Sequence, residues 1–152
     1  MSEYALKAMR IESFLRTSPI FAVYTGYSQI VGQFQHQLNA EEVHFIQALI
    51  LTGIFFEERA VRPTELAQTL KSSRSNISHA LRALEKRGWI ERTTDPADAR
   101  AYYFQLTKSG RKKALRLIKI FDHTQTALEN THAKGAGELL NQFFLHARQF
   151  TK

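Results

Sequence analysis

The apolar residues of this chain recur mainly at steps of three and four, which is the spacing of amphipathic helices. This spacing predicts four long helices, over residues 20–38, 43–56, 107–130 and 138–150. Asn39 is predicted to cap the second of them, because Glu42 follows at the capping-box position three residues later. Thr107 is predicted to cap the third. The second helix is apolar on most sides, so we expect it to be central and buried.

Two shorter helices are predicted in the middle of the chain. Pro63 and Thr64 signal the start of the first, which reaches Leu70. After a tight turn, Ser73 is placed to cap the second, and Gly88 to end it in a left-handed conformation. Its apolar residues form a single stripe at positions 77, 80, 81 and 84. Two helices separated by so few residues form a helix-turn-helix.

The outer face of the second short helix carries small polar and cationic side chains and no acid. These residues are Arg74, Ser75, Ser78, His79 and Arg82. A helix with such a face can enter the DNA major groove and donate hydrogen bonds to base edges and phosphates. An ordinary amphipathic helix with a solvated face shows the same pattern, so the neighbouring segments decide between the two interpretations.

A short β-hairpin is predicted directly after this helix. Residues 89–94 and 101–106 are β-prone, and the turn-rich loop 95–100 between them ends in Arg100. In the second strand Tyr102, Phe104 and Leu106 alternate with Ala101, Tyr103 and Gln105, so we expect the hairpin to have one buried face. A hairpin in this position is a wing, and an arginine at its tip can reach the adjacent minor groove. The sequence therefore predicts a mostly α fold with a small β-hairpin wing.

The positive charge of the chain is concentrated in the same segment. Residues 59–113 hold 13 Lys or Arg and 5 Asp or Glu, whereas the remainder holds 8 basic and 9 acidic residues. A basic surface confined to one module indicates a polyanion-binding site, because each cation near a phosphate releases counterions. An anionic membrane surface is the competing partner, but it would call for large apolar side chains beside the cations. The apolar run of residues 43–56 is too short to span a bilayer.

The composition argues against several other classes of protein. There is no cysteine, which excludes disulfides and thiolate metal sites and fits a reducing compartment. The first residues contain no apolar core of export-signal length, so a cytoplasmic protein is expected. The six histidines form no metal-binding pair, and no nucleophile lies beside a base. We therefore predict no metal ion, no cofactor and no enzymatic activity.

Five runs of residues resemble the MarR family of bacterial winged-helix regulators. They are Thr64-Glu65-Leu66-Ala67, Ser75-Asn76-Ile77-Ser78, Leu84-Glu85-Lys86-Arg87-Gly88-Trp89-Ile90, Asp95-Pro96-Ala97-Asp98-Ala99-Arg100 and Leu106-Thr107-Lys108-Ser109-Gly110. They stand in the order and spacing of the family over about a third of the chain. The most specific element is the wing motif Asp98-x-Arg100 followed by Leu-Thr-x-x-Gly.

The resemblance implies roles for individual residues. Carried over by position, the major-groove contacts of the family fall on Ser75, Asn76, Ser78, His79 and Arg82. With Arg74 from the helix face they form the predicted DNA-binding set, and Arg100 is placed in the minor groove. Asp98 is the support residue that pairs with Arg100 and orients it. The family often has a second basic residue where this chain has Ala99, so the wing is expected to depend on Arg100 alone.

The resemblance also implies an obligate homodimer built from the first helix and the last two, docked on a pseudo-palindromic operator. Independently, the apolar helices 20–38 and 138–150 exceed what a small winged helix can cover, which favours burial against a second copy. Most members of the family repress transcription and release DNA when a small aromatic or phenolic effector binds between their lobes. Residues on the helices that would line such a pocket are Tyr24, Tyr27, His44, Phe45 and Phe55, although aromatics at helical spacing are also ordinary core.

We therefore predict a winged helix-turn-helix inserted between dimerisation helices. The expected parts are residues 1–58 (N-terminal helices, dimerisation and core), 59–110 (DNA-binding lobe) and 111–152 (C-terminal dimerisation helices). The predicted function is a sequence-specific transcriptional regulator, a ligand-responsive repressor that binds double-stranded DNA as a homodimer. Two alternatives stay open, namely a winged-helix module that binds protein and an activator without a small-molecule effector.

Overall fold

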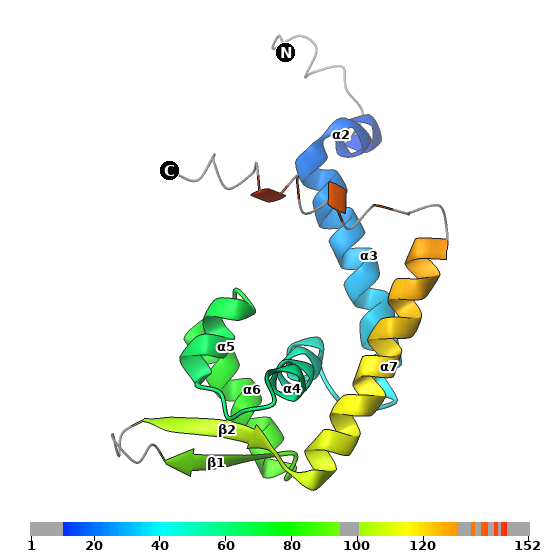
Figure 1. The fold of residues 1–152 in the computed structure, drawn as a ribbon. Helices are drawn as coiled ribbons and strands as arrows, with labels where there is room; N and C mark the ends of the chain where they lie inside the picture. The colour runs from blue at the N-terminus through cyan, green and yellow to red at the C-terminus, as the bar shows by residue number, and fades with distance from the viewer. Residues whose placement is uncertain are drawn as a thin grey trace. The chain divides into compact units, whose positions relative to one another are not determined.

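The computed structural model describes residues 11–94 and 101–130, together with residues 135, 138–139, 142 and 144–145. The chain divides into two compact units, Met1–Phe45 and Ile46–Lys152. The described elements are α2 (Ile11–Thr17), α3 (Pro19–Asn39), α4 (Phe45–Glu57), α5 (Pro63–Thr69), α6 (Arg74–Lys86), β1 (Ile90–Thr94), β2 (Tyr102–Leu106) and α7 (Lys108–Asn130), as labelled in Figure 1. Helices with one small hairpin are the fold class that the sequence predicts.

The first unit contains α2 and α3, and it corrects one sequence prediction. Asn39 does not cap the next helix, because it is itself the last residue of α3. Glu42 has a φ of 55°, which is incompatible with the helical capping-box position that it was expected to occupy. Instead the side chain of Gln35 forms hydrogen bonds with the backbone at the start of α4. Its Oε1 accepts a hydrogen bond from the Phe45 N–H at 3.1 Å, and its Nε2 donates to the Val43 carbonyl at 3.1 Å.

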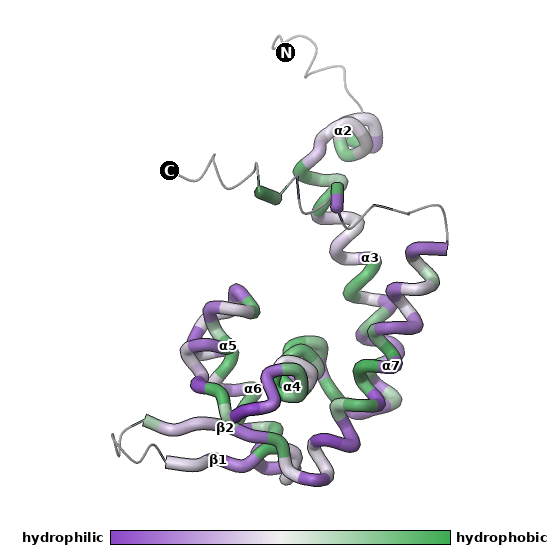
Figure 2. The backbone as a smooth tube through the Cα atoms, viewed as in Figure 1, coloured by the Kyte–Doolittle hydropathy of each residue, from purple (hydrophilic) through white to green (hydrophobic). Residues whose placement is uncertain are grey.

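Helix α4 supplies the centre of the second unit. Its buried side chains are Gln47, Ala48, Ile50, Leu51, Thr52 and Ile54, and Figure 2 shows that the helix is hydrophobic along most of its length. The polar Thr52 is satisfied locally, since its hydroxyl donates to the Ala48 carbonyl at 3.0 Å. The prediction of a buried central helix is confirmed except at its end, where Phe56 is 69% exposed.

The helix-turn-helix forms as the sequence predicts. Pro63 opens α5, where a missing N–H costs nothing. The Ser73 hydroxyl caps α6 by accepting a hydrogen bond from the Asn76 N–H at 3.2 Å. Just after the C-terminal end of the helix, Gly88 adopts a left-handed conformation with a φ of +66°. The apolar stripe of α6 is buried at Ile77, Ala80, Leu81 and Leu84. These contacts turn the opposite, polar face of α6 outward.

The turn between α5 and α6 contains a strained residue that offers a test. Lys71 is exposed and has a φ of 50°, a left-handed conformation that costs a residue with a Cβ about 1 kcal/mol. We expect Lys71→Gly to raise the free energy of unfolding by about 0.5–1 kcal/mol in urea titrations. Lys71→Ala removes the same charge but keeps the Cβ, so it should bring no such gain. An equal gain in both variants would show that charge, not backbone strain, is responsible.

The hairpin is fixed on both of its edges. β1 and β2 pair antiparallel with Ile90 opposite Leu106. On the other edge of β2, Val61 exchanges two backbone hydrogen bonds with Phe104, with N···O distances of 2.9 Å in both directions. Phe104 is buried, but Tyr102 on the same face is 39% exposed, so the expected buried face of the hairpin forms only in part. The chain just before α5 therefore holds the base of the wing.

Helix α7 begins at the end of the hairpin. Thr107 caps it as predicted, because its Oγ1 accepts a hydrogen bond from the Gly110 N–H at 3.0 Å. The predicted helix 138–150 falls mainly outside the described residues, and residues 138–139, 142 and 144–145 are helical. Within the described part of the chain, no helix combines the length and apolar character needed to cross a bilayer.

Candidate nucleic-acid interface

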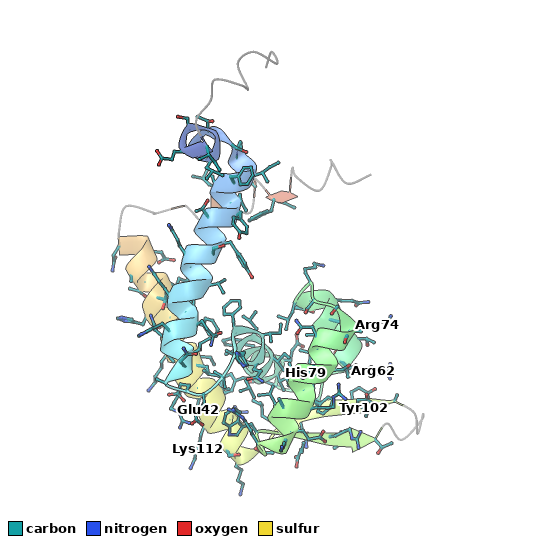
Figure 3. All side chains as sticks on the ribbon, turned by 180° about the vertical axis from the view of Figure 1, so that it is seen from behind. Glu42, Arg62, Arg74, His79, Tyr102 and Lys112 are labelled. Carbon is teal, nitrogen blue, oxygen red and sulfur yellow. The ribbon has the colours of Figure 1, made fainter. Side chains whose placement is uncertain are left out.

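The outer face of α6 is polar, basic and accessible. Residues 74–76, 79 and 82 are exposed and Ser78 is half-buried. Figure 3 shows Arg74 and His79 on α6, with Arg62 and Tyr102 on the neighbouring elements. The first acid of the helix is Glu85, near its C-terminal end. The N-terminal part of this face thus offers hydrogen-bond donors without a competing carboxylate, as a DNA-reading helix requires.

Two of the predicted reading side chains make contacts within the helix-turn-helix itself. The Asn76 Nδ2 donates to the Ser72 hydroxyl at 2.9 Å, so this side chain also ties α6 to the preceding turn. The Arg82 Nε donates to the Ser78 carbonyl at 3.3 Å, which aligns the guanidinium along the helix. Contacts of these residues with DNA stay a prediction.

The tip of the wing lies outside the described residues. Asp98 and Arg100 both fall in this gap, so their predicted roles also stay predictions. The two strands that lead to the tip are described, and side chains on them make contacts with the helix-turn-helix and the segment before it that the sequence reasoning missed.

Two arginines join the wing to the helix-turn-helix. Arg62 Nη2 donates to the Tyr103 hydroxyl at 2.7 Å, and its guanidinium lies 5.0 Å from the centre of that ring. Arg92 lies 5.3 Å from the ring of Tyr102, and its Nε is 3.9 Å from Glu85 Oε1 on α6. The count of charged residues over positions 59–113 included both arginines. It did not show that Arg62 reaches the wing, because that depends on the pairing of Val61 with β2.

The base of the hairpin is bonded to the start of α7. The Gly88 carbonyl accepts hydrogen bonds from Thr107 Oγ1 at 2.7 Å and Ser109 Oγ at 2.8 Å. The Trp89 carbonyl accepts one from the Thr107 N–H at 3.1 Å. The Leu-Thr-x-x-Gly motif is therefore the segment that closes the wing against the end of α6.

One cation of the basic segment is neutralised within the protein. Arg59 Nη1 lies 3.0 Å from Glu65 Oε2, and its Nη2 lies 3.1 Å from Glu57 Oε2. The hydrogen bond and charge of Glu65, with a smaller contribution from Glu57, raise the pKa of Arg59 above its ordinary value. Arg59 is therefore a weaker candidate for binding phosphate than Arg74.

The residues named for an effector pocket belong to different units. Tyr24 and Tyr27 are exposed on α3, and His44 is exposed before α4. The ring of Phe45 packs 5.9 Å from that of Phe34 in the first unit. Phe55, in the second unit, packs 4.8 Å from the Arg111 guanidinium. A shared pocket stays a prediction. Among the described residues, no three His, Asp or Glu side chains form a metal-binding group.

Comparison with known proteins identifies the family. Residues 43–110 match a winged helix DNA-binding domain. The transcriptional regulator AdcR of Streptococcus pneumoniae is 30% identical over 108 residues, which cover 67% of this chain and 74% of AdcR. The chain belongs to the MarR family of winged-helix transcriptional regulators. Another relative, the transcriptional repressor MprA of Escherichia coli, is 44% identical over 54 residues, or 36% of this chain. That match spans only 31% of MprA, and the match to PrsX of Escherichia coli spans 45% of PrsX.

Solved structures show the same MarR fold. The MepR–DNA complex of Staphylococcus aureus aligns with a TM-score of 0.76 at 18% identity, covering 87% of this chain and 97% of MepR. BldR of Sulfolobus solfataricus aligns with a TM-score of 0.74 at 19% identity, covering 93% of this chain and 99% of BldR. At these identities the likeness concerns the fold, so the residue roles depend on the site itself.

Proposed function

We propose that this protein is a sequence-specific DNA-binding transcriptional repressor that acts as a homodimer on a pseudo-palindromic operator. The observation that carries the proposal is the exposed face of α6, where Arg74, His79 and Arg82 stand on a helix whose opposite stripe is buried. A face of donors without acids is suited to base edges and phosphates. Relatives named as repressors, and a structural neighbour solved with DNA, support the same assignment.

The proposed homodimer is supported by the first unit. The exposed residues Ile20, Tyr24 and Tyr27 form one apolar stripe along α3, and Ile11 adds to the apolar surface of α2. Such a surface favours burial against a second copy of the chain. Two wing-bearing lobes related by a two-fold axis would then read the two halves of a palindromic site.

Release of DNA by a small aromatic or phenolic effector is the regulatory part of the proposal. It rests on the family resemblance and on the aromatic residues of α3 and α4. As part of the same proposal, the protein acts in the cytoplasm, catalyses no reaction and uses no cofactor.

Removal of single arginines tests the DNA-reading role. We expect Arg82→Ala and Arg100→Ala each to weaken binding of the selected operator by about 1–3 kcal/mol, measured by gel shift or fluorescence anisotropy. Lys119→Ala is the matched control, because it removes an exposed cation from α7 rather than from the wing or α6. A loss in the control equal to that in both variants would point to net charge rather than local contacts.

Selection from random duplexes separates this function from a protein-binding winged helix. We expect the wild-type chain to enrich a pseudo-palindrome and its affinity to fall steeply with added salt. Absence of any sequence preference would favour the protein-interaction module. The sign of regulation would follow from where the enriched site lies relative to a promoter, which separates a repressor from an activator.

A further inference from the structure

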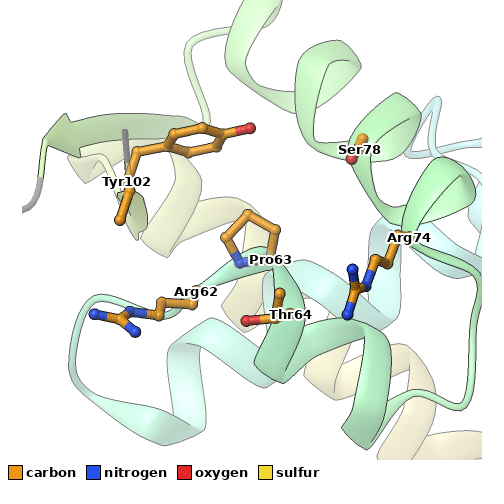
Figure 4. Close-up of a pocket in the computed structure, with 7 residues that line it drawn as sticks. Arg62, Pro63, Thr64, Arg74, Ser78 and Tyr102 are labelled. Atoms are coloured by element: carbon orange, nitrogen blue, oxygen red, sulfur yellow. The ribbon is translucent and has the colours of Figure 1, made fainter. Parts of the chain in front are cut away.

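A cavity of about 340 Å³ lies between the start of α5, α6 and the second strand of the wing. It is lined by Arg62, Pro63, Thr64, Arg74, Ser78, Ala101 and Tyr102. Figure 4 shows the hydroxyl end of Tyr102 directed across the cavity toward Ser78, and the guanidinium of Arg74 on the α6 side. The lining contains the guanidinium of Arg74 and three hydroxyl groups but no carboxylate, which is the chemistry of an anion site. The guanidinium of Arg62 is directed away from the cavity (Figure 4) and is bonded to Tyr103.

A second cavity of about 250 Å³ continues the first along α6. The two share Pro63, Ser78 and Tyr102, so they form one groove between the recognition helix and the wing. Arg82, Glu85 and Arg92 line the second part. From Arg74 to Arg82 the helix rises by about 12 Å, since each residue adds about 1.5 Å. Cations therefore stand along the groove rather than at one point.

We propose that this groove binds the backbone of one DNA strand where it passes from the major groove under α6 to the minor groove under the wing. In this arrangement Arg74 and Arg92 contact phosphodiesters, and the Ser78 and Tyr102 hydroxyls donate to the same strand. The inference rests on the proposed function and adds three residues to it, namely Arg92, Tyr102 and Arg62. Arg62 is a positioning residue, because its guanidinium holds Tyr103 and thereby the wing.

The shape of the groove favours a polymer over a compact anion. One DNA strand carries a phosphate about every 3.4 Å of helix axis, so a groove about 12 Å long spans several phosphates. A small anion would need cations gathered around a single centre. The strand must also cross this region if α6 and the wing tip occupy neighbouring grooves of one duplex.

Glu85 places a carboxylate beside Arg92 in the groove, which a groove with a purely structural role would not need. Its carboxylate lies 3.9 Å from the Arg92 Nε, on an exposed part of the groove wall. An exposed pair of this kind contributes little to stability. Beside a DNA strand, however, the carboxylate repels phosphates and competes for the guanidinium of Arg92. Loss of this carboxylate is therefore expected to tighten DNA binding.

The test compares matched variants on two duplexes, the selected operator and an unrelated sequence of equal length. Arg92→Gln is expected to weaken both by a similar factor, about tenfold, and to make the slope of log K against log salt less negative by about 0.9. Tyr102→Phe is expected to weaken both by about fivefold. Glu85→Gln is expected to tighten both. Lys119→Gln, which changes charge equally on α7, should leave the slope and both affinities unchanged.

The outcomes separate this inference from the function on which it rests. If the wild type binds no duplex, the proposed function fails and the inference fails with it. If Arg82→Ala weakens operator binding while Arg92→Gln and Glu85→Gln change neither duplex, only the groove is overturned. A further experiment replaces chloride by inorganic phosphate at equal ionic strength and measures whether phosphate competes with DNA. Phosphate competition that depends on Arg92, combined with unchanged DNA affinity in Arg92→Gln, would assign the groove to a free anion instead.

Discussion

Gly110→Ala is expected to lower the free energy of unfolding by more than about 3 kcal/mol, because no space exists for a methyl group at this position. A Cβ built on Gly110 would overlap the carbonyl oxygen of Trp89 and stand 2.7 Å from its carbonyl carbon. Both obstacles are backbone atoms, and that carbonyl also accepts the Thr107 N–H. To make room, α7 must move away from the base of the hairpin and break the hydrogen bonds that join them.

The measurement is urea unfolding followed by circular dichroism, at one protein concentration for all variants. Gly53→Ala is the matched control, since Gly53 lies inside α4 and a Cβ there meets nothing within 4 Å. In the control, alanine should raise stability by about 0.5–1 kcal/mol through its helix propensity. A Gly110→Ala protein as stable as the wild type would show that the motif glycine is not required for packing.

Local patterns predicted the elements of the second unit well, because their signals are contained in short stretches. The spacing of Ile77, Leu81 and Leu84 gave the buried stripe of α6, and it also fixed which side chains face outward. Ser73 and Gly88 mark its ends through contacts that span only a few residues. The outward face of the candidate site followed from the same periodicity.

Contacts between distant residues could not be predicted in this way. Asn39 and Glu42 fit a capping box by spacing, yet Gln35 at the end of the preceding helix performs that role. The bond from Arg62 to Tyr103 joins residues 41 positions apart, and depends on the register of Val61 against Phe104. No periodic signal carries such a register. The groove between α6 and the wing, which these contacts shape, was therefore absent from the sequence interpretation.

Tyr24→Glu is expected to convert the proposed homodimer into monomers at micromolar concentration. Ile20, Tyr24 and Tyr27 are 77%, 67% and 61% exposed, although they continue the stripe that is buried further along α3 at Phe34 and Leu38. If a second copy covers this stripe, a two-fold axis buries the new carboxylate twice without a partner. A cost of about 4 kcal/mol would raise the dimer dissociation constant by about 1,000-fold.

Sedimentation velocity measures the oligomeric state, and operator affinity measures its consequence. Loss of one of two linked half-site contacts should weaken binding by about 100-fold or more, because the second contact is then no longer intramolecular. Gln29→Glu is the matched control, since it places the same charge on an exposed position about 140° around α3 from Tyr24. If Tyr24→Glu stays dimeric and binds the operator as the wild type does, the α3 stripe is not the dimer interface. Dissociation in both variants would indicate a general effect of charge on α3, whereas dissociation in Tyr24→Glu alone would place the interface on this face.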